Sequence, residues 1–511
     1  MPAGRTEPLA RSALIAIALA TLLLQLVAIT GYGYFRDELY YLASTRHLDW
    51  GYVEHPPLSI AVLALVRALF GSSLPALRIV PALAGAVTVF LTGSIARRLG
   101  GGGFAQGVAA LAAALAPVFL GTCHYYSMNA LELLLWTVTV WMLIGVLETG
   151  SPRGWIGIGV AIGLGLLNKI SMLWLAGGIG AGLLLTPHRR QLATPWPWLA
   201  FAIAALMFVP HVLWQAGHGW PTLEFMRNAT ARKMVAVAPT DFLLHQVLDM
   251  SPGSAPLWLS GLGFGLFARA GRRGQPLVWI YLSVFALLIL GGRSRASYLA
   301  PAYPMLLALG GVAIERWTAR AGGAWLRGVV VGLVVALGGL AVPMALPVLP
   351  VETFIRYQRA LGTAPRTEER QVVGPLPQQY ADMFGWEELD VEVAKACERL
   401  TPEERRHARV FGQNYGEAGA IDVLGRKYGL PEALSGHNSY WLWGPGDWDG
   451  SVLIIIGGDP ADNAAWFDSV EIVGRTESRY AMPYERGRNI SIGRHLKRPV
   501  REVWPLLKMY I

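Results

Sequence analysis

The feature that most limits the fold of this chain is the recurrence of long apolar segments. A bilayer core of roughly 30 Å is crossed by about 20 apolar residues in a helix. Because 53% of the 511 residues are hydrophobic and only 15% are charged, the composition excludes a soluble enzyme and a disordered chain. The sequence therefore predicts an α-helical polytopic membrane protein. About eleven transmembrane helices are expected, at 12–30, 76–96, 104–121, 129–147, 155–168, 170–186, 197–215, 254–270, 277–291, 298–316 and 328–349.

Basic residues between these segments predict which side of the membrane each connection faces. Arginines fall on every second connection, and the positive-inside rule assigns those connections to the cytoplasm. The N-terminus is therefore expected inside, and an odd number of segments places the C-terminal region outside. The excess of Lys and Arg is scattered over short loops, so it does not indicate binding to nucleic acid. The arginines are Arg5, Arg11, Arg97, Arg98, Arg153, Arg189, Arg190, Arg272, Arg273, Arg316, Arg320 and Arg327.

The fifth and sixth segments are short and meet at Asn168 and Lys169, which leaves two interpretations open. One long helix would reverse every later connection and place Arg272 and Arg273 on the wrong side. A shallow helical hairpin agrees with the charge pattern. It also leaves Lys169 near the outer boundary, where a long side chain can reach water.

Composition changes near Leu349, which separates a membrane module (1–349) from a C-terminal region (350–511) with more charges and shorter apolar runs. Runs of strand length alternate there with helical stretches, so we expect an extracytoplasmic α/β domain. Thr401 followed by Pro402 is typical of a helix start. The expected strands are 409–412, 452–456 and 470–474, and the expected helices include 390–400 and 416–427.

The loop after the first segment, residues 31–75, carries the most conspicuous charged residues. Asp37 and Glu38 lie a few residues beyond the apolar run, and Glu54 and His55 follow. Loops of this length are usually functional or disordered. Because this one is rich in aromatic residues, we expect short helices along the membrane surface. Carboxylates at this depth serve ion transfer, proton transfer or substrate binding, or form a solvated charge pair.

Over roughly residues 10–320 the sequence resembles the GT-C glycosyltransferases. These include the protein O-mannosyltransferases that use dolichyl-phosphate mannose and the bacterial enzymes that move aminoarabinose onto lipid A. The resemblance rests on Tyr-Phe-Arg-Asp-Glu-Leu-Tyr-Tyr-Leu-Ala (34–43), Glu-His-Pro-Pro-Leu (54–58), Gly-Leu-Leu-Asn-Lys (165–169) and Tyr-Leu-Ala-Pro-Ala-Tyr-Pro (298–304). Two further motifs, at 414–421 and 435–445, resemble a bacterial subgroup with a similar outer domain. The resemblance implies the GT-C fold and a place in the bacterial inner membrane.

In this family the acid after the first helix is the catalytic base, and it matches Asp37. The resemblance implies that Asp37 takes a proton from an acceptor hydroxyl as this attacks the anomeric carbon, which inverts that centre. Glu38 is assigned to the catalytic pair, and two roles stay open: orienting the acceptor or pairing with Arg36. The departing phosphate needs cations. The candidates are His55, Lys169, Arg293 and Arg295.

Structural roles stay open for two of these cations, because His55 could be bonded to backbone in its loop and Lys169 could be a snorkelling charge at a helix end.

Where many relatives carry an Asp, this chain has Asn129. Glu132, one helical turn later, either replaces that acid or bonds within the bundle. Trp441 and Trp443 could stack on carbohydrate or pack as structure. The further candidates for substrate binding are Arg36, Tyr40, Glu54, Asn129 and Tyr298.

No cofactor or metal is expected to be required. Asp37, Glu38, Glu54 and His55 could in principle bind a divalent ion, but a phosphate held by several cations needs none. Cys123 and Cys397 indicate neither a disulfide framework nor a metal site. The expected partners are a polyprenyl-phosphate sugar donor, an acceptor glycan, glycolipid or protein, and membrane lipids.

The main alternative is a transporter or lipid flippase with an outer accessory domain. Such proteins place ionisable residues near the bilayer midplane on broken helices, often in paired halves. Here the charges gather at the outer edge and the halves show no symmetry. A scaffold that binds partners through its outer domain leaves the loop 31–75 unexplained.

Overall fold

The computed structural model describes residues 7–319 and 322–511, so Arg5 and Arg320 lie outside the described residues. The chain divides into two compact units. Unit 1 consists of Met1–Gly31, Pro75–Leu213 and Ala236–Leu349. Unit 2 consists of Tyr32–Leu74, Trp214–Val235 and Pro350–Ile511. The predicted boundary at 349/350 coincides with one of the unit boundaries, but the structure groups most of the loop 31–75 with the C-terminal region.

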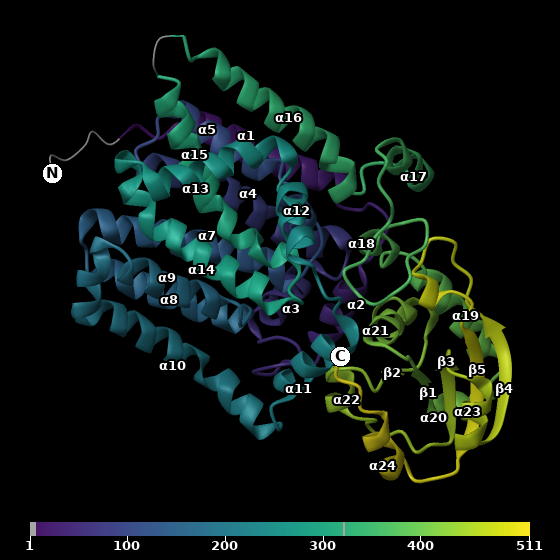
Figure 1. The fold of residues 1–511 in the computed structure, drawn as a ribbon. Coiled ribbons are helices and arrows are strands. Elements are labelled where there is room, and N and C mark those ends of the chain that lie inside the picture. The colour runs from purple at the N-terminus through teal and green to yellow at the C-terminus, as the bar shows by residue number, and fades with distance from the viewer. Residues whose placement is uncertain (1–6, 320–321) are drawn as a thin grey trace. The chain divides into compact units, whose positions relative to one another are not determined.

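Unit 1 is helical at every apolar segment that the sequence indicates (Figure 1). The expected segment 104–121 is interrupted before Pro117, which has no backbone N–H to continue a helix. The helices are α1 (Arg11–Ala28), α4 (Leu74–Arg98), α5 (Gly103–Ala114), α6 (Pro117–Thr122), α7 (Met128–Thr149), α8 (Arg153–Asn168), α9 (Met172–Leu184), α10 (Pro195–Gly217), α12 (Pro239–Asp249), α13 (Ala255–Phe267), α14 (Gln275–Gly291), α15 (Tyr303–Trp317) and α16 (Trp325–Ala345), with 3₁₀ turns η1 (Pro187–Ala193), η3 (Pro252–Ser254), η4 (Arg269–Gly274) and η5 (Ala296–Ala302).

Seven helical stretches of the described chain are long and apolar enough to cross a membrane. Four of the predicted segments form shorter helices: α5, α8, α9 and α13 have 12, 16, 13 and 13 residues. The expected number of eleven spans therefore stays a prediction. The seven stretches are Arg11–Ala28, Leu74–Arg98, Met128–Thr149, Pro195–Gly217, Arg269–Gly291, Ala296–Trp317 and Trp325–Ala345.

The break between α8 and α9 decides between the two interpretations of this region. Lys169 has extended backbone angles (φ −157°, ψ 132°), and helical structure resumes only at Met172. The two helices contact one another and lie side by side (Figure 1). The single long helix is thus wrong, and the hairpin is confirmed.

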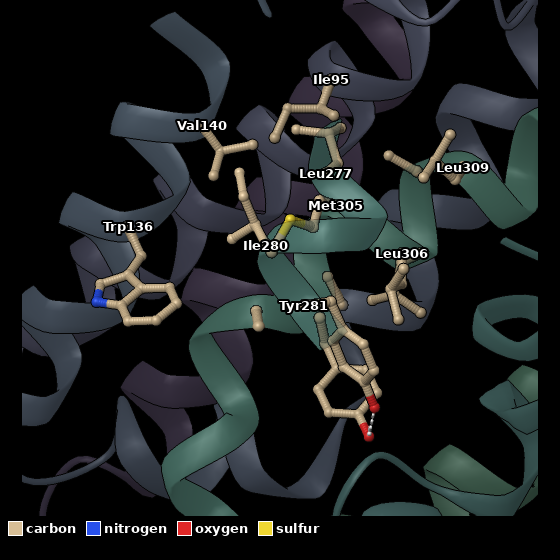
Figure 2. Close-up of a cluster of buried hydrophobic side chains, with 14 of the residues drawn as sticks. Ile95, Trp136, Val140, Leu277, Ile280, Tyr281, Met305, Leu306 and Leu309 are labelled. Atoms are coloured by element: carbon tan, nitrogen blue, oxygen red, sulfur yellow. Dashed lines mark hydrogen bonds between the residues drawn. The ribbon is translucent and has the colours of Figure 1, made fainter. Parts of the chain in front are cut away.

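The core of unit 1 is a continuous set of buried apolar side chains from most of its helices, among them α7, α14 and α15. Figure 2 shows Trp136 and Val140 of α7 facing Leu277 and Ile280 of α14 and Met305 of α15. Each of these side chains is at most 2% exposed. Truncating a buried residue of this size typically costs about 2–5 kcal/mol, so this core fixes how the helices of unit 1 pack.

Unit 2 contains a five-stranded mixed sheet in the order β2-β1-β3-β5-β4. The first strand pairs in parallel with β2 and β3, whereas β5 is antiparallel to β3 and β4. Every residue of β3 is buried, as its apolar run indicates. The three predicted strands are confirmed, and two further strands were not predicted. The strands are β1 (Ala408–Phe411), β2 (Ala433–Leu434), β3 (Val452–Ile456), β4 (Phe467–Arg475) and β5 (Asn489–Leu496).

Helices flank the sheet and continue the α/β pattern that the sequence predicts (Figure 1). Thr401 and Glu404 form a capping box at the start of α20, as expected from Thr401-Pro402. The helices of unit 2 are α2 (Arg36–Ser44), α3 (Leu58–Phe70), α11 (Pro221–Asn228), α17 (Val351–Ala360), α18 (Gln378–Ala381), α19 (Trp386–Glu398), α20 (Pro402–His407), α21 (Tyr415–Val423), α22 (Ser439–Trp443), α23 (Pro460–Trp466) and α24 (Val500–Val503), with shorter turns at η2 (Ala229–Lys233), η6 (Gly425–Tyr428), η7 (Pro483–Glu485) and η8 (Trp504–Leu507).

Two short helices form in the loop 31–75, as expected, but α2 is buried in protein. Its residues from Leu39 to Ala43 are at most 4% exposed, and α2 packs on α21. The prediction that this apolar stretch lies in the membrane interface is therefore wrong. Close packing is possible because Gly416 and Gly419 of α21 face α2 without side chains.

Replacing Gly419 by Ala is expected to destabilise unit 2 and to displace α2. An added Cβ would lie 2.9 Å from the backbone carbon of Leu39 and 3.0 Å from the nitrogen of Tyr40, so the backbone must shift. We expect a loss of about 1–3 kcal/mol, the typical cost of overpacking, measured as a lower melting temperature. Gly180→Ala in α9 is the matched control because no atom lies within 4 Å of its added Cβ. Equal melting temperatures for both variants would contradict this packing.

Candidate active site

The first turn of α2 positions the acidic pair that the sequence singles out. Glu38 is fully buried, and its carboxylate accepts a hydrogen bond of 2.9 Å from the backbone N–H of Phe35. An acid at this position satisfies an unpaired donor and interacts favourably with the helix dipole. The geometry therefore supports a capping role for Glu38, which differs from both roles left open by the sequence.

Asp37 has a different environment from its neighbour, because its side chain is 33% exposed. The Tyr415 hydroxyl donates to Asp37 Oδ1 at 2.9 Å, and Arg36 Nε lies 3.6 Å from the same oxygen. These contacts orient the carboxylate without enclosing it. Asp37 is thus fixed in direction and accessible to a ligand.

Arg36 links this carboxylate to a buried polar group. Its Nη1 donates to the Tyr484 hydroxyl at 2.7 Å, and its Nη2 lies 3.7 Å from Asp382 Oδ2. Burial raises the pKa of Asp382 to about 6, although the charge of Arg36 acts in the opposite direction. Burial also opposes the charge on Arg36, but Asp382 and neighbouring groups raise its pKa well above the usual value. Arg36 is therefore a fixed cation beside Asp37.

Tyr40 and Glu54 form the adjoining part of this polar network. The Tyr40 hydroxyl donates to Glu54 Oε2 at 3.0 Å, and Asn438 Nδ2 donates to Glu54 Oε1 at 3.3 Å. The Ser439 backbone N–H donates to the Tyr40 hydroxyl at 3.3 Å. Burial raises the pKa of Glu54 to about 7 from its usual 4.5.

This shift predicts a pH-dependent stability. The fold favours protonated Glu54, so the free energy of unfolding should fall as the pH rises from about 4.5 to about 7. Glu54→Gln removes this titration while keeping a polar group between Tyr40 and Asn438. We therefore expect the variant to gain melting temperature relative to wild type across this window. If the melting temperatures of the two proteins changed with pH in the same way, Glu54 would be charged in the folded protein.

His55 is enclosed by its own loop. It is 1% exposed, its Nδ1 lies 3.0 Å from the carbonyl oxygen of Pro56, and its ring packs 4.8 Å from Tyr41 and 5.0 Å from Tyr52. This placement favours the backbone-bonded role over phosphate binding, because the ring offers almost no surface to a ligand.

A second polar cluster lies in unit 1 around Lys169. Its Nζ lies 2.6 Å from Glu132 Oε2 and donates to Asn129 Oδ1 at 2.8 Å. The hydroxyl of Ser171 donates to the other oxygen of Glu132. The Lys169 and Glu132 side chains are only 15% and 6% exposed. Glu132 thus bonds to other residues of the helical bundle. It gives Lys169 the carboxylate partner that Asn129, an amide, cannot provide.

Tyr298 completes this cluster from η5. Lys169 Nζ lies 5.1 Å from the centre of its ring, a distance typical of a cation–π contact. Arg295 immediately precedes η5, and its carbonyl accepts from the Tyr298 N–H at 3.2 Å. Arg293, two residues earlier, is exposed, and Arg295 is half-buried. Unit 1 therefore contains three candidate cations. Lys169 is paired with a carboxylate, and the two arginines lie on the segment that leads to Tyr298.

The structure brings the sequence candidates together in two groups, one in each unit. Arg36, Asp37, Tyr40 and Glu54 share a network in unit 2, and Asn129, Lys169 and Tyr298 share one in unit 1. Sequence reasoning missed Tyr415, Asn438, Asp382 and Tyr484. The motifs at 414–421 and 435–445 contain the first two, but no sequence pattern marks Asp382 or Tyr484.

The tryptophans of this region have structural partners. Trp441 Nε1 donates to the carbonyl oxygen of Trp504 at 3.0 Å, and Trp443 stacks on His47 with ring centres 4.2 Å apart. These contacts favour packing over carbohydrate stacking. In residues 7–319 and 322–511 no three His, Cys, Asp or Glu side chains are grouped to hold a metal ion, and metal independence stays a prediction.

The sequence is similar to known membrane glycosyltransferases. A family model described as dolichyl-phosphate-mannose-protein mannosyltransferase matches residues 54–214. The lipid A galacturonosyltransferase RgtD of Rhizobium johnstonii is 23% identical over 52% of this chain and 56% of its own length. An undecaprenyl phosphate-α-4-amino-4-deoxy-L-arabinose arabinosyl transferase of Pseudomonas aeruginosa is 31% identical over 26% of this chain and 25% of its own. The chain thus spans about half or less of these curated relatives.

Solved structures extend the similarity to nearly the whole fold. ArnT of Cupriavidus metallidurans, in a crystal structure with bound undecaprenyl phosphate, has a TM-score of 0.58 at 15% identity, covering 94% of this chain and 97% of that chain. An oligosaccharyltransferase of Archaeoglobus fulgidus has a TM-score of 0.52 at 13% identity, covering 83% and 64%. The chain therefore has the GT-C fold, and its sequence is similar to those of membrane glycosyltransferases.

Proposed function

We propose that this protein transfers a sugar from a polyprenyl-phosphate donor to an acceptor hydroxyl, with inversion, at the extracytoplasmic face of the bacterial inner membrane. The accessible carboxylate of Asp37, held by Tyr415 and Arg36, is the observation that carries this proposal. Relatives named as lipid A and arabinosyl transferases support the reaction class. The N-terminus is cytoplasmic in this proposal, as the arginine pattern predicts.

In the reaction, the acceptor oxygen forms a bond to the anomeric carbon while the bond from that carbon to the phosphate oxygen breaks. Asp37 takes the proton of the acceptor hydroxyl, and the polyprenyl phosphate leaves with both electrons of the broken bond. Tyr415 and Arg36 keep the carboxylate in place. Glu38 contributes by stabilising the first turn of α2 rather than by touching substrate.

Cations of unit 1 hold the departing phosphate in this proposal. Arg293 and Arg295 offer guanidinium groups that bind phosphate oxygens in a bidentate manner. Lys169 adds a positive charge whose position is set by Glu132 and Asn129. The proposal assigns no phosphate contact to the enclosed His55 and no step to a metal.

Purified protein in liposomes tests this function directly. We expect a polyprenyl-phosphate-linked sugar and an envelope glycan, glycolipid or protein acceptor to yield glycosylated product and free polyprenyl phosphate. Nuclear magnetic resonance of the product should show the anomeric configuration opposite to that of the donor. Movement of intact donor across the bilayer without cleavage would instead support the flippase alternative and overturn the proposal.

A further inference from the structure

A short segment of unit 2, Lys508–Ile511, is bonded through its backbone to the turn before α22 and is called here the anchoring segment. The Met509 N–H donates to the Gly436 carbonyl oxygen at 2.8 Å, and the Asn438 N–H donates to the Met509 carbonyl oxygen at 2.9 Å. Gly436 permits this approach, because a Cβ added there would overlap the Leu507 carbonyl oxygen. The two stretches are therefore joined as closely as neighbouring strands.

The side chain of Asn438 pairs with the end of the anchoring segment. Its Oδ1 accepts from the Ile511 N–H at 3.0 Å, and its Nδ2 donates to the Ile511 backbone oxygen and to Glu54 Oε1, both at 3.3 Å. These bonds use both amide hydrogens and the amide oxygen. Asn438 also has φ 50° and ψ −130°, a conformation that persists only where the surroundings enforce it. The anchoring segment supplies part of that constraint.

The ring of His437 connects the anchoring segment to α21. Its Nε2 lies 2.8 Å from the Ile511 backbone oxygen, and its Nδ1 lies 3.3 Å from the Tyr415 backbone nitrogen. Because a backbone N–H can only donate, Nδ1 is the acceptor and Nε2 carries the hydrogen that is donated to Ile511. Burial lowers the pKa of His437 to about 3. The ring is therefore neutral, and both of its nitrogens are bonded.

The bond from His437 fixes the start of α21. Tyr415 is the first residue of this helix, where backbone N–H groups have no partner within the helix. The side chain of Asn414 accepts from the next two N–H groups, and His437 accepts from that of Tyr415. The hydroxyl of the same tyrosine donates to Asp37 Oδ1 at 2.9 Å. Asp37 is thus linked to the anchoring segment through one tyrosine and one histidine.

The anchoring segment is itself held by α11 and by an aromatic contact. Asn228 Nδ2 donates to the Tyr510 carbonyl oxygen at 2.8 Å. The Tyr510 ring is 3% exposed and packs edge-on against Trp441, with ring centres 5.6 Å apart. Lys508 Nζ lies 2.6 Å from Glu224 Oε2, but both side chains are partly exposed, and such pairs contribute little. The buried ring and the backbone bonds therefore fix the segment.

We propose that the anchoring segment is a positioning element for Asp37 and acts through His437 and Tyr415. The proposal rests on the proposed function, in which Asp37 takes the proton of the acceptor. Without the segment, Nε2 of His437 loses its acceptor, and the ring can turn away from the Tyr415 N–H. A misplacement of about 1 Å in a catalytic group can cost on the order of 100-fold in rate.

The experiment compares the full chain in liposomes with a variant that lacks residues 508–511. Two acceptors are used: the hydroxyl acceptor of the wild-type assay, and azide, which has no proton to lose and needs no base. We expect the variant to transfer sugar to the hydroxyl on the order of 100-fold more slowly and to form the glycosyl azide at nearly the wild-type rate. A merely structural role would lower both rates by the same factor.

His437→Gln tests the link without shortening the chain. The glutamine amide can still donate toward Ile511, but the acceptor for the Tyr415 N–H is lost. A buried donor without a partner should make transfer to the hydroxyl about tenfold slower, again with little change for azide. His407→Gln is the matched control, because this histidine lies in unit 2 with its side chain 50% exposed. We expect it to behave as the wild type with both acceptors.

Hydrogen exchange at the Tyr415 amide provides a measurement that does not depend on transfer. We expect faster exchange in His437→Gln and in the shortened variant, and unchanged exchange in His407→Gln. Wild-type transfer and unchanged exchange in His437→Gln would overturn the proposal and leave the proposed function intact. Equal losses with both acceptors in His437→Gln would also overturn it. A wild-type protein that transfers no sugar would instead overturn the proposed function.

Discussion

Asp37→Asn is expected to lower the rate of sugar transfer by about 10²–10⁴-fold, the usual contribution of a positioned general base. The amide oxygen can still accept the hydrogen bond from Tyr415, so the local structure should persist. The amide cannot take a proton at neutral pH. Transfer rates in liposomes under saturating donor, together with melting temperatures, separate the loss of chemistry from a loss of folding.

Asp468→Asn provides the matched control for this experiment. Asp468 is an exposed aspartate at the start of β4, so the same change of charge and size is made away from α2. We expect this variant to transfer sugar at the wild-type rate. Near wild-type activity of Asp37→Asn would remove the base from the proposed mechanism.

Lys169→Met is expected to impair both stability and transfer. The substitution leaves Glu132 buried without its cation, and breaking a buried ion pair of this kind costs about 3–5 kcal/mol. Loss of a cation at the departing phosphate should slow transfer by about 10²–10³-fold, the typical effect of losing one electrostatic contact to a transition state. The melting temperature and the transfer rate report the two effects separately.

The double variant Lys169→Met/Glu132→Gln separates these effects. Neutralising the carboxylate removes the unpaired charge, so we expect most of the melting temperature to return. Transfer should remain slow because the cation is still absent. A double variant that regains both stability and activity would show that Lys169 serves the packing of unit 1 and not the donor phosphate.

Much of unit 1 could be predicted because a bilayer limits the backbone to a few solutions. Spanning segments must satisfy their hydrogen bonds internally, so apolar runs such as 12–30 and 328–349 had to become helices. Charge patterning also favoured the hairpin, and the extended backbone at Lys169 agrees. The end of α5 was missed in the prediction of one segment at 104–121, although Pro117 within that apolar run is a sequence signal for a break.

The polar networks were harder to predict because their partners lie far apart in the sequence. Tyr415 is separated from Asp37 by 378 residues, so no local pattern could connect them. The capping role of Glu38 was not predicted, because Phe35, which precedes α2, is not a usual capping residue. Strand β5 contains Gly493 and Arg494 and is held by pairing with β3 and β4, which local propensity does not report.

The central claim, that Asp37 removes a proton from the acceptor, is tested most directly by azide as an alternative acceptor. Azide attacks the anomeric carbon through nitrogen and has no proton to lose, so its transfer needs no base. We predict that Asp37→Asn loses transfer to the hydroxyl acceptor by at least about 10²-fold but forms the glycosyl azide at a rate near that of the wild type. Equal losses with both acceptors would show that Asp37 positions the site and does not act as the base.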